Sequence, residues 1–295
     1  MHKKFFNSRY PIFVPAMHGC SNIEFYKAVY DAGCVPMMCV DSTLKPGRFL
    51  TNLNKMSKHA KDGEYGVMLH HTDFTTPGVV QALKIYRPKY INYWPRVGNK
   101  DQILTKEIVY SPNRGFSELA NDPLVLDTIT ELAQYSKIIM RMFLSEDSPH
   151  ENLISAYELK SEDSAGWFGF QSKQQLLESF APKNKAMIVL GGVGTPLQVK
   201  NLVTAGASAV GIGTLFAVTH ESELSEAAKQ KIIQAHSQDL YDWGLRQRIL
   251  NVDESHKSMI GDDVWQQNST PQYLYQITQD RKSTRLNSSH IPLSR

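Results

Sequence analysis

Cysteine is scarce in the 295-residue sequence and long apolar runs are missing, and each absence excludes a class of protein. The three cysteines, Cys20, Cys34 and Cys39, have neither the spacing of a metal site nor that of a disulfide framework, so a reducing cytoplasm is the expected compartment. No segment approaches the roughly 20 apolar residues of a membrane helix. The basic N-terminus lacks the apolar stretch of a secretory signal. We therefore expect a cytoplasmic protein without a membrane partner.

A positive surface is also lacking once the last fifteen residues are set aside. The net charge of +3 comes from 32 basic and 29 acidic residues. Residues 281–295 contribute four of the basic residues and no acidic one, which leaves a net charge of −1 for the rest. The composition of this segment predicts disorder, and it resembles a tail translated through a sequencing-adaptor junction. Without it, nothing favours a nucleic-acid partner.

Eight short apolar runs carry the fold prediction. Continuous apolarity, in contrast to strict alternation, is typical of parallel strands buried on both faces. The runs lie at residues 10–17, 34–40, 65–71, 89–94, 137–143, 153–160, 185–192 and 208–214. Helix signals separate most of them, although only residues 148–152 are available for a helix between the fifth run and the sixth. Strands alternating with helices predict an α/β fold, a (β/α)8 TIM barrel.

Two of the intervening segments carry complete helix signals. Ser21 opens a capping box that starts one helix, which is expected to end at Gly33. Thr195 opens a second capping box, with proline at the first helical position, and this helix is expected to end at Gly206. Both segments therefore fit the helical half of a β/α unit.

The C-terminal part predicts an extension of the barrel. Residues 222–250 have apolar side chains at helical spacing, which predicts a helix that caps the barrel or forms an oligomer surface. The domain prediction is a barrel over residues 1–240, a helical or lid-like extension over 241–280 and a disordered tail over 281–295. The sequence leaves the oligomeric state open.

Two glycine clusters follow the seventh and eighth runs. The first, GGVGTP at 191–196, fits a dinucleotide-binding GxGxxG turn poorly, because Leu197 occupies the third glycine position and no acidic residue follows at the required distance. In a TIM barrel, however, a phosphate commonly binds between the loops after strands seven and eight. The predicted phosphate ligands are the backbone N–H groups of Gly191, Gly192 and Gly213 and the hydroxyl of Thr214. The alternative is that these glycines serve only tight turns.

At these motifs the sequence resembles a known family. Residues 188–222 resemble the flavin-phosphate region of the nitronate monooxygenases, also called 2-nitropropane dioxygenases. Residues 11–33 resemble that family's first loop and helix, where the backbone approaches the flavin ring. The resemblance spans residues 10–235, is thin between 95 and 135, and implies FMN as the cofactor. The cofactor contacts that it implies are Met17, His18, Gly19, Met68, Lys160, Ala165, Gly166, Gly191, Gly192, Gly211, Ile212, Gly213 and Thr214.

The sequence departs from the family at three positions. Met68 stands where the family's third strand ends in an asparagine. Trp167 replaces the histidine that serves the family as catalytic base, and Trp94 replaces a second histidine at the end of strand four. An indole has only a donor N–H, so it cannot take a proton from a nitroalkane. A substrate already ionised as its nitronate needs no base.

The turn at residues 160–177 resembles another branch of the family. It begins with a lysine and acidic residues and contains no histidine. That branch resembles the enoyl reductases of polyketide and polyunsaturated fatty-acid synthases, in which the flavin passes a hydride to an enoyl thioester. This chemistry depends less on a single side-chain base.

A histidine pair at the end of the third strand supplies the catalytic candidate. Alternation turns one of His70 and His71 toward the barrel mouth, and His70 is the candidate acid–base group or substrate donor. The alternative is a solvated pair bonded to loop backbone. Cys20 lacks the neighbouring signature of a nucleophile and is expected to be a small buried residue.

The sequence thus predicts an FMN-dependent oxidoreductase that oxidises nitronates with oxygen. An enoyl-thioester reductase is the first alternative, and a degenerate flavin-binding barrel without turnover is the second. In either enzyme the partner is a small-molecule substrate, with NAD(P)H as a candidate electron donor. A phosphate-sugar isomerase or synthase is disfavoured, because no strand end supplies a convincing pair of carboxylates.

Overall fold

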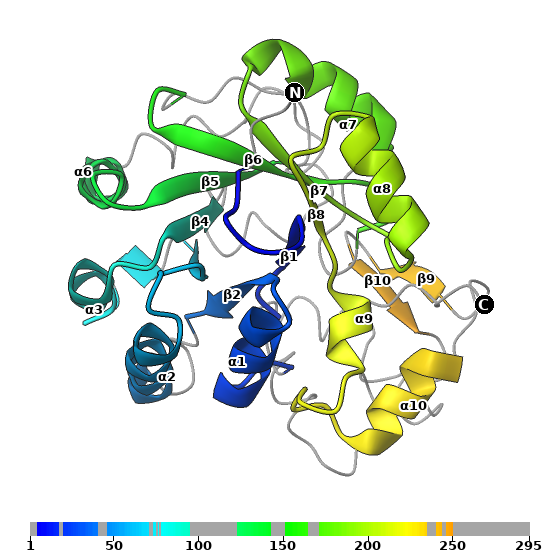
Figure 1. Ribbon diagram of the computed structural model, residues 1–295, viewed down its shortest axis with the longest axis horizontal. Coiled ribbons are helices and arrows are strands. Elements are labelled where there is room, and N and C mark those ends of the chain that lie inside the picture. Colours follow the sequence, from blue (N-terminus) through cyan, green and yellow to red (C-terminus); the bar gives the residue numbers. More distant parts are fainter. Residues whose placement is uncertain are drawn as a thin grey trace.

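The computed structural model describes residues 5–17, 20–40, 46–70, 73–74, 76, 78–94, 123–142, 151–164, 171–234, 240–243 and 246–249. Eight parallel strands close into a barrel in chain order, and helices surround them (Figure 1). The strands are β1 (Ile12–Val14), β2 (Val35–Cys39), β3 (Gly66–His70), β4 (Tyr90–Trp94), β5 (Lys137–Met142), β6 (Ile154–Lys160), β7 (Ala186–Leu190) and β8 (Ala209–Gly211). Each lies within one of the eight predicted runs, and the predicted TIM barrel is confirmed.

Helices follow most of the strands. They are α1 (Ile23–Asp31), α2 (Pro46–His59), α3 (Val79–Tyr86), α6 (Pro123–Leu132), α7 (Lys173–Phe180), the 3-10 turn η3 (Ala181–Lys183), α8 (Pro196–Thr204), α9 (Thr214–Ala217) and α10 (Glu226–Gln234). The short connection predicted between the fifth and sixth strands lies largely outside the described residues. No helix in the described ranges is both long enough and apolar enough to cross a membrane.

The two predicted helix starts have different outcomes. Thr195 caps α8 in a complete capping box with Gln198, as predicted. The prediction for α1 was wrong by one residue, because its cap is Asn22 and not Ser21. The Asn22 carboxamide oxygen accepts from the backbone N–H of Phe25 at 2.8 Å, and this satisfies an amide at the open end of the helix.

Side chains alternate between the barrel interior and the helix-facing layer. An inner cluster fills the barrel; among its members are Phe13, Tyr90, Ile139, Ala156 and Ile188. Residues at the alternate strand positions face outward and pack beneath the helices; Val67 and Leu69 in β3 are examples. This alternation determines which side chains at the strand ends face the mouth of the barrel.

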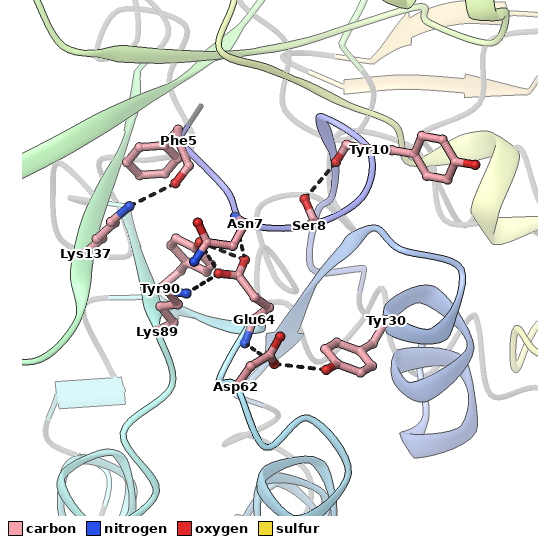
Figure 2. A network of polar contacts seen from close by, with 10 residues as sticks. All are labelled: Phe5, Asn7, Ser8, Tyr10, Tyr30, Asp62, Glu64, Lys89, Tyr90 and Lys137. Carbon is pink, nitrogen blue, oxygen red and sulfur yellow. Dashed lines mark hydrogen bonds and ion pairs between the residues drawn. The ribbon is translucent and has the colours of Figure 1, made fainter. Parts of the chain in front are cut away.

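The N-terminal segment lies at the amino ends of the strands (Figure 2). Phe5 and Phe6 pack against Tyr90, the first residue of β4. Lys137, the first residue of β5, donates to the backbone carbonyl of Phe5 at 2.9 Å. These contacts close the amino end with aromatic side chains.

The C-terminal extension differs in part from the prediction. Among the described residues, the helix predicted over 222–250 is found as α10, whereas β9 (Leu240–Trp243) and β10 (Arg246–Ile249) form an antiparallel hairpin. The helix prediction is therefore wrong for these two strands. Cross-strand pairing supplies their backbone hydrogen bonds, and the local spacing of apolar residues carries no information about it. The remainder of 241–280 and the tail at 281–295 lie outside the described residues, and the domain limits stay a prediction.

Candidate active site

The predicted site residues come together at the carboxyl ends of the strands. Parallel strands in chain order bring all eight carboxyl ends to one rim. The predicted residues that the structure describes at or near this rim are Met17, Met68, His70, Lys160, Gly191, Gly192, Gly211, Ile212, Gly213 and Thr214. His18, Gly19, Ala165 and Gly166 lie outside the described residues, as does Trp167, and only the backbone of Trp94 is described.

Gly191 has a packing reason to be glycine. Its φ of 129° lies in the region that favours glycine, and an added Cβ would overlap the hydroxyl of Ser161. The turn after β6 is bonded to the end of β7: Ser164 Oγ donates to the Leu190 carbonyl at 2.8 Å, and the Ser161 N–H donates to the same oxygen at 3.1 Å. The close packing of this turn is therefore sufficient to explain why residue 191 is a glycine, without a bound phosphate. Ser161 Oγ is buried there and has no hydrogen-bond partner among the described residues.

The start of α8 is already satisfied by the protein. The Gln198 side-chain oxygen accepts from the backbone N–H groups of Gly194 at 2.9 Å and Thr195 at 3.1 Å. These amides are engaged and do not point to an external anion. Neither residue was among the predicted phosphate ligands, and the prediction of Gly191 and Gly192 after β7 with Gly213 and Thr214 after β8 stays a prediction.

Gly213 is an open position beside the first loop. Its φ of −100° suits any residue, and the nearest atoms of the described residues to an added Cβ would be Met17 Sδ and Pro15 Cγ, both at 3.6 Å. The structure thus brings Met17 and Gly213 together from opposite ends of the barrel sequence. Thr214 follows as the first residue of α9. Gly211 is different, since its Cβ would overlap the side chain of Leu190, so it is required for packing.

A buried polar cluster of three residues lies inside the barrel, and none of the three was predicted from the sequence. Asn92, Arg141 and Glu158 each stand two residues beyond a member of the inner apolar cluster, so alternation turns them inward. Arg141 donates to Glu158 Oε1 through Nε at 3.0 Å and through Nη2 at 2.9 Å. Asn92 Nδ2 donates to Glu158 Oε2. The sequence signal that could have revealed this cluster was a charged residue inside each of two strand-like runs, Arg141 in 137–143 and Glu158 in 153–160.

Lys160 extends this cluster toward the rim. It is the last residue of β6 and lies on the same inner face as Glu158, two residues further along. Burial, helped by the positive charge of Arg141 and opposed by the negative charge of Glu158, lowers the pKa of Lys160 to about 7. The amine is therefore partly neutral near pH 7.

The end of β3 carries the predicted histidine. Alternation with Met68 puts His70 on the inner face at the rim, while His71 lies outside the described residues. The backbone N–H of His70 donates to Asp73 Oδ2 at 2.7 Å, and this buried carboxylate was missed by the sequence reasoning. A catalytic role of His70 stays a prediction.

Cysteine and metal chemistry find no support among the described residues. Burial, followed by the charge of Glu223, raises the pKa of the Cys20 thiol to about 12, so Cys20 is a buried thiol as expected. No group of three or more metal-ligating side chains gathers within the described ranges.

An eight-stranded barrel with open glycine loops after its last two strands is typical of phosphate-binding α/β barrels. The model of the nitronate monooxygenase family matches residues 181–241, which include both glycine clusters. The family resemblance predicted from those motifs is confirmed for this segment. No curated protein matches the chain.

Solved structures share the fold at low sequence identity. FabK from Thermotoga maritima has a TM-score of 0.72 and 15% identity, with 97% of this chain and 86% of that chain covered. The enoyl reductase domain of MlnA, from the macrolactin biosynthesis cluster of Bacillus amyloliquefaciens, has a TM-score of 0.61 and 13% identity, with 93% and 72% covered. A nitroalkane oxidase from Streptomyces ansochromogenes has a TM-score of 0.54 and 14% identity, with 77% and 71% covered.

Proposed function

We propose that this protein is an FMN-dependent oxidoreductase that oxidises nitronates. The observation that carries the proposal is the open position at Gly213 beside Met17, within a segment that matches the nitronate monooxygenase family. Both residues were predicted as flavin contacts from widely separated parts of the sequence. A packing requirement does not account for glycine at this position, whereas the close approach of a ligand does.

The described residues fit FMN. The phosphate would lie against the backbone of Gly192 and Gly213 and the hydroxyl of Thr214. Ser161 Oγ, buried and without a partner among the described residues, is a further polar atom beside Gly191 that a ligand could satisfy. Met17, Met68 and Lys160 are the contacts proposed for the ring. When bound, FMN supplies two-electron chemistry, accepting electrons from a nitronate or delivering a hydride to an activated alkene.

The chain's own part in this reaction is binding and orientation. The inner apolar layer beneath the rim, which includes Ile188 and Leu190, excludes water from the floor of the site. A nitronate carries negative charge on oxygen. Arg141 balances the carboxylate of Glu158, and the protonated fraction of Lys160, whose pKa is about 7, adds further positive charge. The resulting positive excess favours an anionic substrate near the rim.

An enoyl-thioester reductase is the second candidate. It is favoured by Trp167, which stands where the family has its histidine base, and by the likeness in fold to a protein described as an enoyl reductase domain. Reduction of an enoyl thioester would use NAD(P)H as the electron donor. The described residues support both candidates equally at the phosphate loops.

The first test is the visible spectrum of the purified protein, with the released cofactor identified by mass. A flavin spectrum and the mass of FMN are expected. Turnover of ionised nitropropane with oxygen, and of a model enoyl thioester with NAD(P)H, then separates the two candidates. Flavin that neither substrate system reduces or reoxidises would favour a barrel without turnover. Folded protein that stays empty after FMN is added would contradict the proposal.

A further inference from the structure

Lys160 occupies an unusual position for a lysine. It is buried at the last residue of β6, on the inner face of the barrel, and its register partner on β7 is Leu190. Lysine is seldom this deeply buried, and strongly perturbed titratable groups cluster at functional sites. Lys160 follows Glu158 by two residues on the same face of β6, so it stands nearer than Glu158 to the carboxyl end of the strand.

Charged groups face Lys160 from its own strand and from the strand beside it. Arg141 comes from β5 and Glu158 from β6 itself, whereas β7 has no titratable side chain. Across the barrel, His70 lies on the inner face of β3 at the rim. Both oxygens of Glu158 are engaged, one by Arg141 and the other by Asn92. The carboxylate therefore holds the arginine in position, and the arginine charge acts on the lysine.

These surroundings favour an amine that changes protonation state near neutral pH. Burial is the larger cause of the lowered pKa of about 7, and Arg141 is the second. A general base works best when its pKa lies near the working pH. The Asp73 carboxylate accepts a hydrogen bond from the backbone N–H of His70, so it is engaged with the backbone at the end of β3.

We propose that Lys160 is the acid–base group of this site and that it deprotonates neutral nitroalkanes, with Glu158 and Arg141 as its positioning residues. The C–H bond next to the nitro group breaks, the proton goes to the lone pair of Lys160 Nζ, and the electron pair stays on the substrate as the nitronate. The ammonium then returns its proton to solvent. The substrate class rests on the proposed function, but the proton transfer needs no oxidant.

The decisive measurement compares a neutral nitroalkane with its preformed nitronate on FMN-loaded protein. Only the neutral form needs a base. In Lys160→Met and Lys160→Arg we expect the ratio of kcat/KM for nitroethane to that for its nitronate to fall by about 100-fold or more. An unchanged ratio in both variants would overturn the inference. If this ratio falls in His70→Gln and not in the Lys160 variants, His70 is the base instead.

A second readout does not require turnover. Exchange of the α-hydrogens of nitroethane with deuterium oxide, followed by proton NMR, reports the proton transfer itself. Wild-type protein should accelerate the exchange and Lys160→Met should not, and FMN binding is followed separately by absorbance. If the protein binds no FMN, the proposed function fails, while the exchange experiment still decides the role of Lys160. If Lys160→Met loses FMN and keeps the exchange, Lys160 only holds the cofactor and the inference is wrong.

The positioning residues have a signature in the pH profile. In wild type, kcat/KM for nitroethane should rise with pH and level off above about 7, because the base must be deprotonated. Arg141→Met removes a positive charge near Lys160, so the rise of kcat/KM should move to higher pH by about one unit. Glu158→Gln removes a negative charge, so the rise should move to lower pH by about one unit. Arg141→Lys keeps the charge and should shift the rise less than Arg141→Met. Glu64→Gln, which changes a buried carboxylate far from the rim, is the matched control and should not move it. Shifts of the same sign in Arg141→Met and Glu158→Gln would overturn the charge-based role.

Discussion

Glu64 and Glu158 are both buried carboxylates, but they lie at opposite ends of the barrel and are held in different ways. Glu64 precedes β3 and accepts from Tyr90 through both of its oxygens, from the backbone of Asn7 at 3.2 Å, and from Lys89 (Figure 2). Glu158 stands inside the barrel, where Arg141 and Asn92 are its partners.

The difference lies in how far the partner cation is from water. The side chain of Lys89 is 27% exposed, whereas that of Arg141 is 8% exposed. At the amino end, Phe5, Phe6 and Tyr90 close the barrel, so the carboxylate there ties the N-terminal segment to the strands. Near the carboxyl ends, the same residue type belongs to a charge cluster with Arg141 and Lys160. Active sites of TIM barrels lie at the carboxyl ends of the strands, so Glu158 stands near the proposed site whereas Glu64 stands at the opposite end.

The largest expected effect tests this difference in depth. Arg141→Met leaves Glu158 buried without its cation and should lower the free energy of unfolding by about 3–5 kcal/mol. Glu64→Gln keeps a polar group of the same size, and Lys89 can reach water, so the loss should be about 1–3 kcal/mol. Guanidinium unfolding followed by circular dichroism gives both values. Equal losses would show that depth does not separate the two ends.

The two glycine loops at the rim allow a comparison between packing and ligand binding. Gly191→Ala introduces a Cβ into the Ser161 hydroxyl at an unfavourable φ and should destabilise the protein by about 2–3 kcal/mol. Gly213→Ala has room for its Cβ and should cost less than about 1 kcal/mol. Fluorescence titration with FMN should nevertheless show at least about tenfold weaker binding for Gly213→Ala, because the methyl group occupies the ligand's side of the loop. Unchanged FMN affinity in Gly213→Ala would contradict the proposed contact between FMN and Gly213.

A further comparison concerns the dependence of stability on pH, whose sign differs between the two ends. The pKa of Lys160 is about 7 in the folded protein and near 10.4 when unfolded, so the unfolded chain binds more protons between these values and stability should rise with pH there. Burial, reinforced by Glu64, raises the pKa of Tyr90 above its ordinary value near 10, so stability should fall as the pH rises above about 10.

Thermal unfolding midpoints measured from pH 6 to 11 test both signs. Lys160→Met should remove the rise between pH 7 and 10, and Tyr90→Phe should reduce the fall above pH 10. A wild-type midpoint that is flat between pH 7 and 10 would mean that Lys160 is not neutralised by burial. The two variants serve as controls for each other, because each leaves the opposite end of the barrel unchanged.

The sequence by itself determined the barrel. Continuous apolar runs with interposed capping signals specify strands buried on both faces, and short-range patterns are sufficient for this because each β/α unit repeats the same local rules. The glycine motifs after the seventh and eighth runs predicted a phosphate site, and this stays a prediction. The helix assigned to residues 240–249 was wrong because strand pairing is a cross-strand property that the local spacing of apolar residues does not reveal.

Only the tertiary structure decided what each rim residue contacts. Gly191 and Gly213 belong to the same kind of motif, yet one is needed for the packing of the β6 turn and the other is open beside Met17. Arg141, Glu158 and Asn92 are separated in sequence by up to 66 residues and meet only when the barrel closes. The charge state of Lys160 depends on that meeting and on its burial, because pKa values are determined by surroundings in space and not by neighbours along the chain.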